Sequence, residues 1–422
     1  MAGLEEKLCP VCFQEAMEHG ECRNCGYHAE ESSAVKDYLA PFTILKEKYL
    51  LGKSLGQGGF GITYLAENMQ SGLRCCIKEY FPSGLLQGRT PDGALILADE
   101  ENRPEYEEGK QQFIEEACAL QELRENISVV DILDFFEENG TAYFAMELIE
   151  GCNLRVFRKN HNPKQTLKMA LQMLFLLGSS LAEVHRFGMI HGDISPENIL
   201  ITQDGEIKLI DFGAARSFRQ GSDNKERKIY LKPNYAPYEQ YTQKPCQGPW
   251  TDIYALAATF YFIVSGRKML DALSRAKGAS YPPLHELCPA VSRQLSDVID
   301  KALAFDYHDR YRRMLDFLDA LEQVVRPEDY DIDLGALMPK SKASKQAEIH
   351  VETSDDSEKM CQVEEQNMPE PKRLAAFFHP KKRRLAYLEL TMRKSGGHIS
   401  RCASSHGEGR AFGDERRDDA SG

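Results

Sequence analysis

The segment HGDISPEN places an aspartate and an asparagine five positions apart, at Asp193 and Asn198, in a chain of 422 residues. A carboxylate and an amide at this spacing can accept the proton of a hydroxyl group and ligate Mg²⁺, which prefers oxygen ligands. Asp211, which follows the strand-like run Ile207–Ile210 and opens an Asp-Phe-Gly triplet, offers a second carboxylate for the metal. The pattern predicts phosphoryl transfer to a hydroxyl, with Asp193 as base and Asn198 and Asp211 as magnesium ligands.

Residues 56–61 have the sequence GQGGFG and lie between two strand-like runs. Such glycines let a backbone approach phosphates closely, but the pattern alone is weak, and its dinucleotide-binding version requires a helix after the turn. Here a strand-like run follows, and the next run carries Lys78, whose ammonium can pair with the α- and β-phosphates of ATP. Glu116, on a helix-patterned segment, is well placed to hold that lysine, although Glu115 is an equally ordinary helix glutamate.

Four cysteines form two Cys-x2-Cys pairs, nine residues apart, in a segment with few large apolar side chains; they are Cys9, Cys12, Cys22 and Cys25. Paired thiolates of this kind bind structural Zn²⁺ tetrahedrally, and an iron site is the less favoured alternative. Four unrelated cysteines would leave this segment without a core. We therefore predict a zinc-ribbon-like module over residues 1–30, with a partner that the sequence does not identify.

The elements that position these residues change character along the chain. After a linker at 31–48, residues 49–150 alternate like antiparallel strands and include an Asn-Gly hairpin signal and one helix-patterned segment, Gln111–Arg124. Residues 82–108 are rich in Gly, Pro, Asp and Glu and are interpreted as a polar insertion.

Residues 151–325 show helical spacing in four segments: Lys164–Arg186, Trp250–Ser265, Ser292–Ala304 and Met314–Val325. The chain is thus expected to have an α+β fold of two lobes. The first lobe would be an antiparallel sheet with one main helix, and the second would be mainly α-helical.

Composition excludes some classes of protein. Apolar residues make up 42% and charged residues 28%, as in folded globular proteins, and a net charge of −13 argues against binding nucleic acid through overall charge. The apolar windows Met169–Val184 and Leu256–Val264 are interrupted by polar residues or are too short, so we expect no transmembrane segment. Without an export signal the twelve cysteines are interpreted as reduced thiols or metal ligands, which predicts a cytoplasmic protein.

Residues 326–422 lose the helical periodicity and are expected to form a tail without a stable fold. The tail is acidic from Glu348 to Glu370 and then basic from Lys372 to Lys394, with aromatic residues in the basic part. The basic part could contact an acidic partner, nucleic acid or an anionic membrane, but a solvated tail is the favoured interpretation.

These motifs, in this order and with the phrases KEYFPSGL, HGDISPENILI and YAPYEQY, resemble a bacterial eukaryotic-like serine/threonine protein kinase from Tyr49 to Val325. The resemblance implies ATP, Mg²⁺ and protein substrates. It implies that Glu239 pairs with Arg310 and that Asp252 anchors the loop of Asp193. The ATP-binding residues that it implies are Leu55, Gly56, Gln57, Gly58, Gly59, Phe60, Gly61, Thr63, Cys76, Lys78, Met146, Glu147, Ile149 and Leu200.

Several positions depart from the family pattern. Gly192 replaces the arginine that pairs with an activation-loop phosphate, so we expect activity without that phosphorylation. Ser195 replaces a lysine near the γ-phosphate, and Lys232 replaces a loop threonine. One hypothesis is that Lys232 acts in catalysis by restoring the missing charge, and the alternative is that it is a solvated loop lysine. Thr63 and Cys76 make the surface above adenine more polar than the usual valine and alanine.

An active protein kinase is the favoured function because no departure removes Lys78, Asp193, Asn198 or Asp211. The alternative is a pseudokinase or signalling scaffold that binds partners through the zinc module and the tail. A small-molecule kinase is a further alternative, less favoured because the segment Tyr235–Glu239 resembles protein-directed enzymes.

Overall fold

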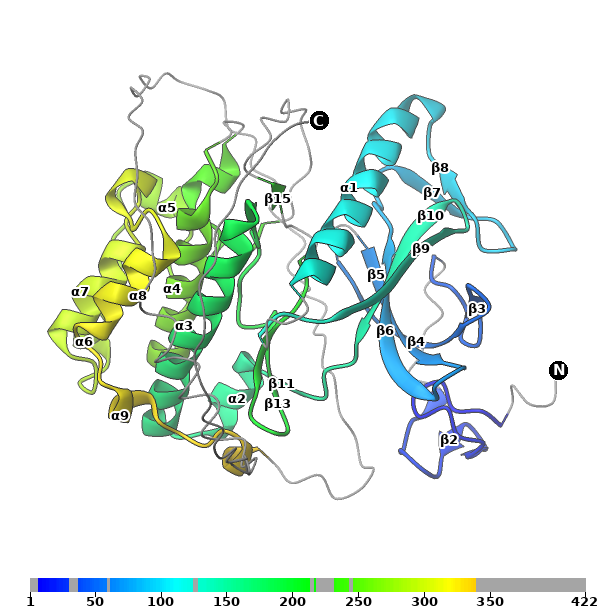
Figure 1. Ribbon diagram of the computed structural model, residues 1–422, viewed down its shortest axis with the longest axis horizontal. Coiled ribbons are helices and arrows are strands. Elements are labelled where there is room, and N and C mark those ends of the chain that lie inside the picture. The colour runs from blue at the N-terminus through cyan, green and yellow to red at the C-terminus, as the bar shows by residue number, and fades with distance from the viewer. Residues whose placement is uncertain are drawn as a thin grey trace, which may run out of the picture. The chain divides into compact units, whose positions relative to one another are not determined.

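The computed structural model describes residues 7–29, 37–58, 61–123, 128–212, 216–217, 231–242 and 246–338. A β-rich lobe with one long helix stands beside a mainly helical lobe (Figure 1). The predicted fold class, an α+β protein of two lobes after a small cysteine-containing module, is confirmed.

The N-terminal lobe is built on a six-stranded antiparallel sheet of order β3-β4-β5-β6-β10-β9. Its strands are β3 (Ile44–Leu45), β4 (Tyr49–Gln57), β5 (Gly61–Asn68), β6 (Leu73–Tyr80), β9 (Ile132–Glu138) and β10 (Thr141–Glu147). The predicted hairpin joins β9 to β10, where Asn139 and Gly140 both adopt positive φ, 53° and 73°. Asparagine and glycine tolerate this backbone conformation best, which is why the pair indicates a tight hairpin turn.

Part of the segment assigned to a linker belongs to this lobe. Strand β3 extends the sheet before Tyr49, and Leu39 is only 7% exposed, with its backbone N–H donating to the Tyr64 hydroxyl at 3.1 Å. Leu45 is completely buried. Residues before the expected boundary at Tyr49 therefore also contribute to the lobe. The two-residue strand β3 leaves too short an alternation to be recognised in the sequence.

The polar insertion contains a hairpin and the beginning of the main helix. The hairpin is formed by β7 (Leu86–Arg89) and β8 (Leu95–Leu97), and the helix α1 spans Arg103–Glu122. We expected the helix to begin at Gln111. Its first two turns are almost entirely polar, so periodicity did not reveal them, although Pro104 near the first position is typical of a helix start.

Two apolar layers cover the two faces of the sheet. On one face α1 buries Phe113, Ala117 and Leu120, and the Phe113 ring stacks on that of Phe144 with centroids 4.8 Å apart. On the other face the residues before β4 and the β7–β8 hairpin close a second cluster around Tyr64. Burial on both faces fixes the register of the strands that carry the candidate site.

The C-terminal lobe surrounds α3 (Pro163–Arg186). The other helices are α2 (Leu154–Asn160), α4 (Pro249–Ser265), α5 (Ala272–Ala276), α6 (Leu284–Leu287), α7 (Arg293–Ala302), α8 (Met314–Glu322) and α9 (Pro327–Tyr330). One helix in the described part of the chain, α3, has the length and composition of a membrane span. In the lobe it is a core helix: Met169, Met173 and Leu177 are fully buried, and a Cβ at Gly178 would lie 2.7 Å from Leu318.

The helical lobe continues past the expected boundary at Val325. After α9, Leu334 and Met338 are 2% and 6% exposed and join the main core cluster. The two residues are four positions apart, and a single pair at this spacing is too short a pattern to indicate a helix. The acidic and basic parts of the tail, within residues 339–422, lie outside the described residues.

Candidate active site

The loop that carries Asp193 lies between β12 (Met189–Ile190) and β13 (Ile199–Thr202) and is anchored by Asp252 of α4. The buried Asp252 carboxylate accepts hydrogen bonds from the backbone N–H groups of His191 and Gly192, both at 2.9 Å, and lies 2.8 Å from His185 Nε2. Gly192 has φ +76°, a conformation that glycine adopts without strain. The anchoring role implied for Asp252 is thus present, with His185 as an additional partner.

The Asp193 carboxylate is held on one oxygen by two donors. Asn198 Nδ2 donates to Asp193 Oδ2 and to the Asp193 carbonyl oxygen, both at 2.8 Å. Lys232 Nζ lies 2.9 Å from the same Oδ2 and also donates to Ser195 Oγ at 2.9 Å. Burial raises the pKa of Asp193, and the Lys232 ammonium opposes this shift.

Lys78 of β6 pairs with Asp211, which follows β14 (Ile207–Leu209), with Nζ 2.5 Å from Oδ1. The lysine side chain is 8% exposed and that of Asp211 is 45% exposed. The nearby ammonium lowers the pKa of Asp211, while desolvation opposes this effect. Next to Asp211, the Phe212 ring is buried, 4.3 Å from the His191 ring.

Glu116 of α1 does not form the expected ion pair with Lys78. Burial raises the pKa of Glu116 to about 8, and its Oε1 is buried without a hydrogen-bond partner in the described part of the chain. A carboxyl group that is mostly neutral near pH 7 attracts an ammonium less than the ionised Asp211 does. Of the two neighbouring helix glutamates, Glu116 is nevertheless the better candidate for a role in the site, because Glu115 is exposed and Glu116 is not.

The glycine-rich segment joins β4 to β5. Gly56 and Gln57 end β4, Gly61 begins β5, and the backbone N–H of Gly58 donates to the carbonyl oxygen of Gly61 at 2.8 Å. A Cβ at Gly61 would lie 2.3 Å from the carbonyl oxygen of Glu79, so only glycine fits there. Gly59 and Phe60 lie outside the described residues.

Residues expected around adenine come from five strands, which are β4, β5, β6, β10 and β13. Thr63 is paired with Lys78 across β5 and β6, and Cys76 is paired with both Leu65 and Met146. Burial raises the pKa of Cys76 to about 12, so its thiol stays neutral. Leu200 lies on β13, and Leu55, Met146 and Ile149 are partly buried.

Glu147 at the end of β10 has two polar groups that are already engaged. Its backbone N–H donates to the carbonyl oxygen of Asp131 at 3.0 Å, and its carboxylate accepts from Lys208 Nζ at 2.8 Å. A contact between Glu147 and adenine would therefore use its carbonyl oxygen. Sequence reasoning did not find the Lys208 pair, which no local motif indicates.

The arrangement corresponds to a recognised family. The family model of the protein kinase domain matches residues 49–319. The chain belongs to the protein kinase family. The apo form of PpkA-294, a solved structure, has a TM-score of 0.57 and 34% sequence identity and covers 68% of this chain and 100% of its own.

Two curated relatives are serine/threonine kinases by name. The chain is 31% identical to serine/threonine-protein kinase F of Synechocystis sp. over 286 residues, which are 64% of this chain and 53% of that protein. It is 29% identical to serine/threonine-protein kinase PknA of Nostoc sp. over 289 residues, which are 66% and 48% of the two chains. The chain thus spans about half the length of these relatives.

The segment 231–242 is held on the kinase C-lobe by a buried ion pair. Arg310 donates to Glu239 from Nη1 at 2.7 Å and from Nη2 at 3.1 Å, and both side chains are buried. This pair was implied by the family resemblance. Gln240 Nε2 also donates to the carbonyl oxygen of Gly192 at 2.7 Å, a contact that sequence reasoning missed.

The N-terminal module brings all four of its cysteines together. Their sulfur atoms lie within 4.8 Å of one another, with Cys9 and Cys25 at 3.6 Å and Cys12 and Cys22 at 3.6 Å. These separations are too long for disulfides and close to the roughly 3.8 Å between thiolates bound tetrahedrally to Zn²⁺. The donor set is compatible with zinc.

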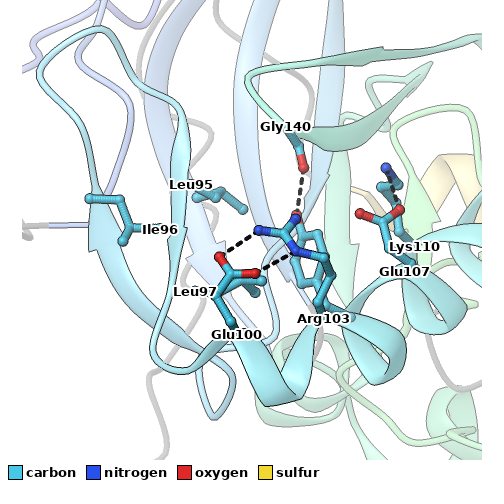
Figure 2. A pocket seen from close by; sticks show the side chains of 9 residues that line it. Leu95, Ile96, Leu97, Glu100, Arg103, Glu107, Lys110 and Gly140 are labelled. Carbon is cyan, nitrogen blue, oxygen red and sulfur yellow. Dashed lines mark hydrogen bonds and ion pairs between the residues drawn. The ribbon is translucent and has the colours of Figure 1, made fainter.

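A separate cavity of about 330 Å³ lies beside the first turns of α1, between β8 and the β9–β10 turn (Figure 2). Arg103 pairs with Glu100 there, and Lys110 pairs with Glu107. Along the helix, Glu116 is roughly 20 Å from Arg103. This cavity is therefore distinct from the site built around Lys78 and Asp193.

Proposed function

We propose that this protein is an active serine/threonine protein kinase that transfers the γ-phosphate of ATP to hydroxyl groups of protein substrates. The observation that carries the proposal is the environment of Asp193. Its carboxylate is held on Oδ2 by Lys232 and Asn198, close to the Lys78–Asp211 pair. The names of the two relatives support the serine/threonine class.

Each polar group has a role in this proposal. Lys78 and the glycine-rich segment Gly56–Gly61 position the phosphates, and Asp193 uses Oδ1 to orient the hydroxyl and accept its proton. Asn198 and Asp211 would hold Mg²⁺, which neutralises phosphate charge when bound. Catalysis then consists mainly of positioning and charge neutralisation.

We further propose that Lys232 restores the charge lost where the family lysine is Ser195. Its ammonium bonds both Asp193 and Ser195, so it occupies the space that a lysine at position 195 would use. Transferring phosphoryl oxygens require positive charge beside them, and a fixed donor supplies it without reorganisation.

The test is transfer of labelled phosphate from ATP to the protein itself and to proteins of a lysate. Lys78→Ala, Asp193→Ala and Asp211→Ala should each abolish most transfer, because each removes a charge from the reacting groups. Circular dichroism and thermal melts should show that these variants remain folded. Full activity in Asp193→Ala would refute the proposal, and ATP binding without transfer by the wild type would favour the scaffold alternative.

We also propose that the module binds one structural Zn²⁺ per chain through Cys9, Cys12, Cys22 and Cys25. The sulfur separations support this, and metal analysis of cysteine-to-serine variants tests it. A cytoplasmic location is part of the proposal, because ATP and reduced thiols are found together there. Protein substrates are the proposed partners.

A further inference from the structure

The cysteine module contacts the kinase N-lobe through its first metal-binding turn, residues Cys9–Cys12. The carbonyl oxygen of Pro10, inside this turn, accepts a hydrogen bond from the backbone N–H of Lys53 on β4 at 2.9 Å. Phe13, directly after the turn, is only 6% exposed. The residues that meet β4 are thus the same residues that two of the cysteines would fix in place.

Strand β4 is irregular at this contact. Its pairing with β5 shifts register between Leu51 and Ser54. On the edge of β4 away from β5, the backbone N–H of Leu51 donates to the carbonyl oxygen of Thr43. Two residues further along the strand, the backbone N–H of Lys53 donates to the carbonyl oxygen of Pro10. The module therefore supplies a backbone acceptor to β4 where the sheet does not continue.

Gly52 makes this approach possible. A Cβ at this position would lie 2.2 Å from the carbonyl oxygen of Pro10 and 2.8 Å from Cζ of Phe13. The first neighbour is backbone and cannot rotate away. Any side chain at position 52 would push the module from the strand, while β4 itself favours β-branched residues.

The contacting turn is followed by a residue with strained backbone geometry. Phe13 has φ +55°, a left-handed conformation that is costly for a bulky residue and must be held by its surroundings. Its backbone N–H donates to the carbonyl oxygen of Cys9 at 2.9 Å. Within residues 7–29, the buried apolar residues are Cys9, Pro10, Phe13 and Cys22, so the module has a very small core to hold this conformation without a bound metal.

We propose that the four-cysteine module is a metal-dependent clamp on β4. When metal is bound, Pro10 and Phe13 hold Gly52 and Lys53, and this orders the glycine-rich segment that begins at Gly56. Loss of the metal releases the strand and weakens ATP binding. The consequence for ATP depends on the proposed kinase function, whereas the clamp itself depends only on the contacts described.

Two kinds of variant distinguish the effect of losing the contact between the module and β4 from the effect of losing the metal site. Gly52→Val removes the contact and leaves all four cysteines, and the double variant Cys9→Ser, Cys22→Ser removes the metal site and leaves β4 unchanged. Leu73→Val is the matched control, because it introduces valine at an exposed position of the same sheet, at the start of β6. The measurements on the full chain are zinc content, amide hydrogen exchange of peptides covering residues 50–57, and KM for ATP.

In both clamp variants, exchange at residues 50–57 should become about 10-fold faster and KM for ATP should rise about 3- to 10-fold, the scale of one lost hydrogen bond. Gly52→Val should retain about one zinc, and Leu73→Val should behave like wild type. Wild-type exchange in folded Gly52→Val, or in the zinc-free cysteine variant, would overturn the clamp. If wild type transfers no phosphate, only the kinase proposal fails, because exchange and zinc content still test the clamp.

Discussion

Lys232 Nζ lies 2.9 Å from Asp193 Oδ2 and 2.9 Å from Ser195 Oγ, so one ammonium joins the segment after residue 230 to the loop of the proposed base. The lysine side chain is 34% exposed and that of Asp193 is 21% exposed. An ammonium group therefore lies beside Ser195, and it comes from a different segment of the chain.

Replacing Lys232 should impair the chemical step. We expect Lys232→Ala to lower kcat by roughly 10- to 1,000-fold, the effect of losing one donor that stabilises the transition state. Adding Ser195→Lys should recover part of this loss, since the new lysine can reach the same space. Steady-state kinetics decide the matter, with Lys277→Ala as an exposed-lysine control. Unchanged kcat in Lys232→Ala would show that the missing lysine is dispensable.

The same contact predicts a shift in pH dependence. Burial raises the pKa of Asp193 and Lys232 lowers it, so removing the ammonium must raise this pKa further. Asp193 acts in its ionised form, so activity is present above its pKa and is lost as the pH falls through it. In Lys232→Met, the acidic limb of kcat/KM should therefore lie at higher pH than in wild type. Superimposable acidic limbs would contradict the electrostatic role.

Glu116 should make stability depend on pH. Its pKa is raised by burial to about 8, so its favourable contribution is complete below the unfolded value of about 4.3 and is lost as the pH rises to about 8. Glu116→Gln resembles the neutral acid and cannot ionise. The Tm of the variant minus the Tm of wild type should therefore be larger at about pH 8.5 than at about pH 6. An equal Tm difference at both pH values would mean that Glu116 is already ionised at about pH 6.

The buried pair of Arg310 and Glu239 should be essential for the C-lobe. Arg310→Ala leaves a buried carboxylate without its cation, which typically costs about 3 to 5 kcal/mol. Thermal and denaturant unfolding would measure the loss. Arg313→Ala is the control, because its pair with Asp316 is largely exposed and should contribute little. Similar stability of the two variants would refute the prediction.

The spacing of motifs correctly predicted those site residues that lie close together in the sequence. Asp193 and Asn198 are five residues apart because one loop must present both, and the structure joins them by a hydrogen bond. The partner of Lys78 could not be predicted in the same way. It depends on which carboxylic acid is ionised, and that depends on burial set by the whole lobe.

Segments with weak periodicity were the main source of error in the fold. The first turns of α1 expose polar side chains, and β3 is two residues long, so neither repeats an apolar pattern often enough to be recognised. The contact of Gln240 with the Gly192 carbonyl oxygen joins residues 48 positions apart, and no local pattern indicates it.

The backbone of Gly192 connects the loop of Asp193 to two other segments of the chain. Gly192 donates its N–H to Asp252 at 2.9 Å and accepts from Gln240 Nε2 at 2.7 Å through its carbonyl oxygen. Hydrogen bonds thus connect the loop of Asp193 both to α4 and to the segment 231–242.

Activity should therefore not require phosphorylation of residues 213–230. Gly192 offers no cation to a phosphate, and the Gln240 and Lys232 contacts already connect the two segments. The serines of this range are Ser217 and Ser222, and it contains no threonine. Phosphatase treatment and the double variant Ser217→Ala, Ser222→Ala should each leave kcat nearly unchanged, whereas Gln240→Ala should lower it. A large loss of activity after phosphatase treatment, reproduced by the double variant, would mean that another cation binds a phosphate here.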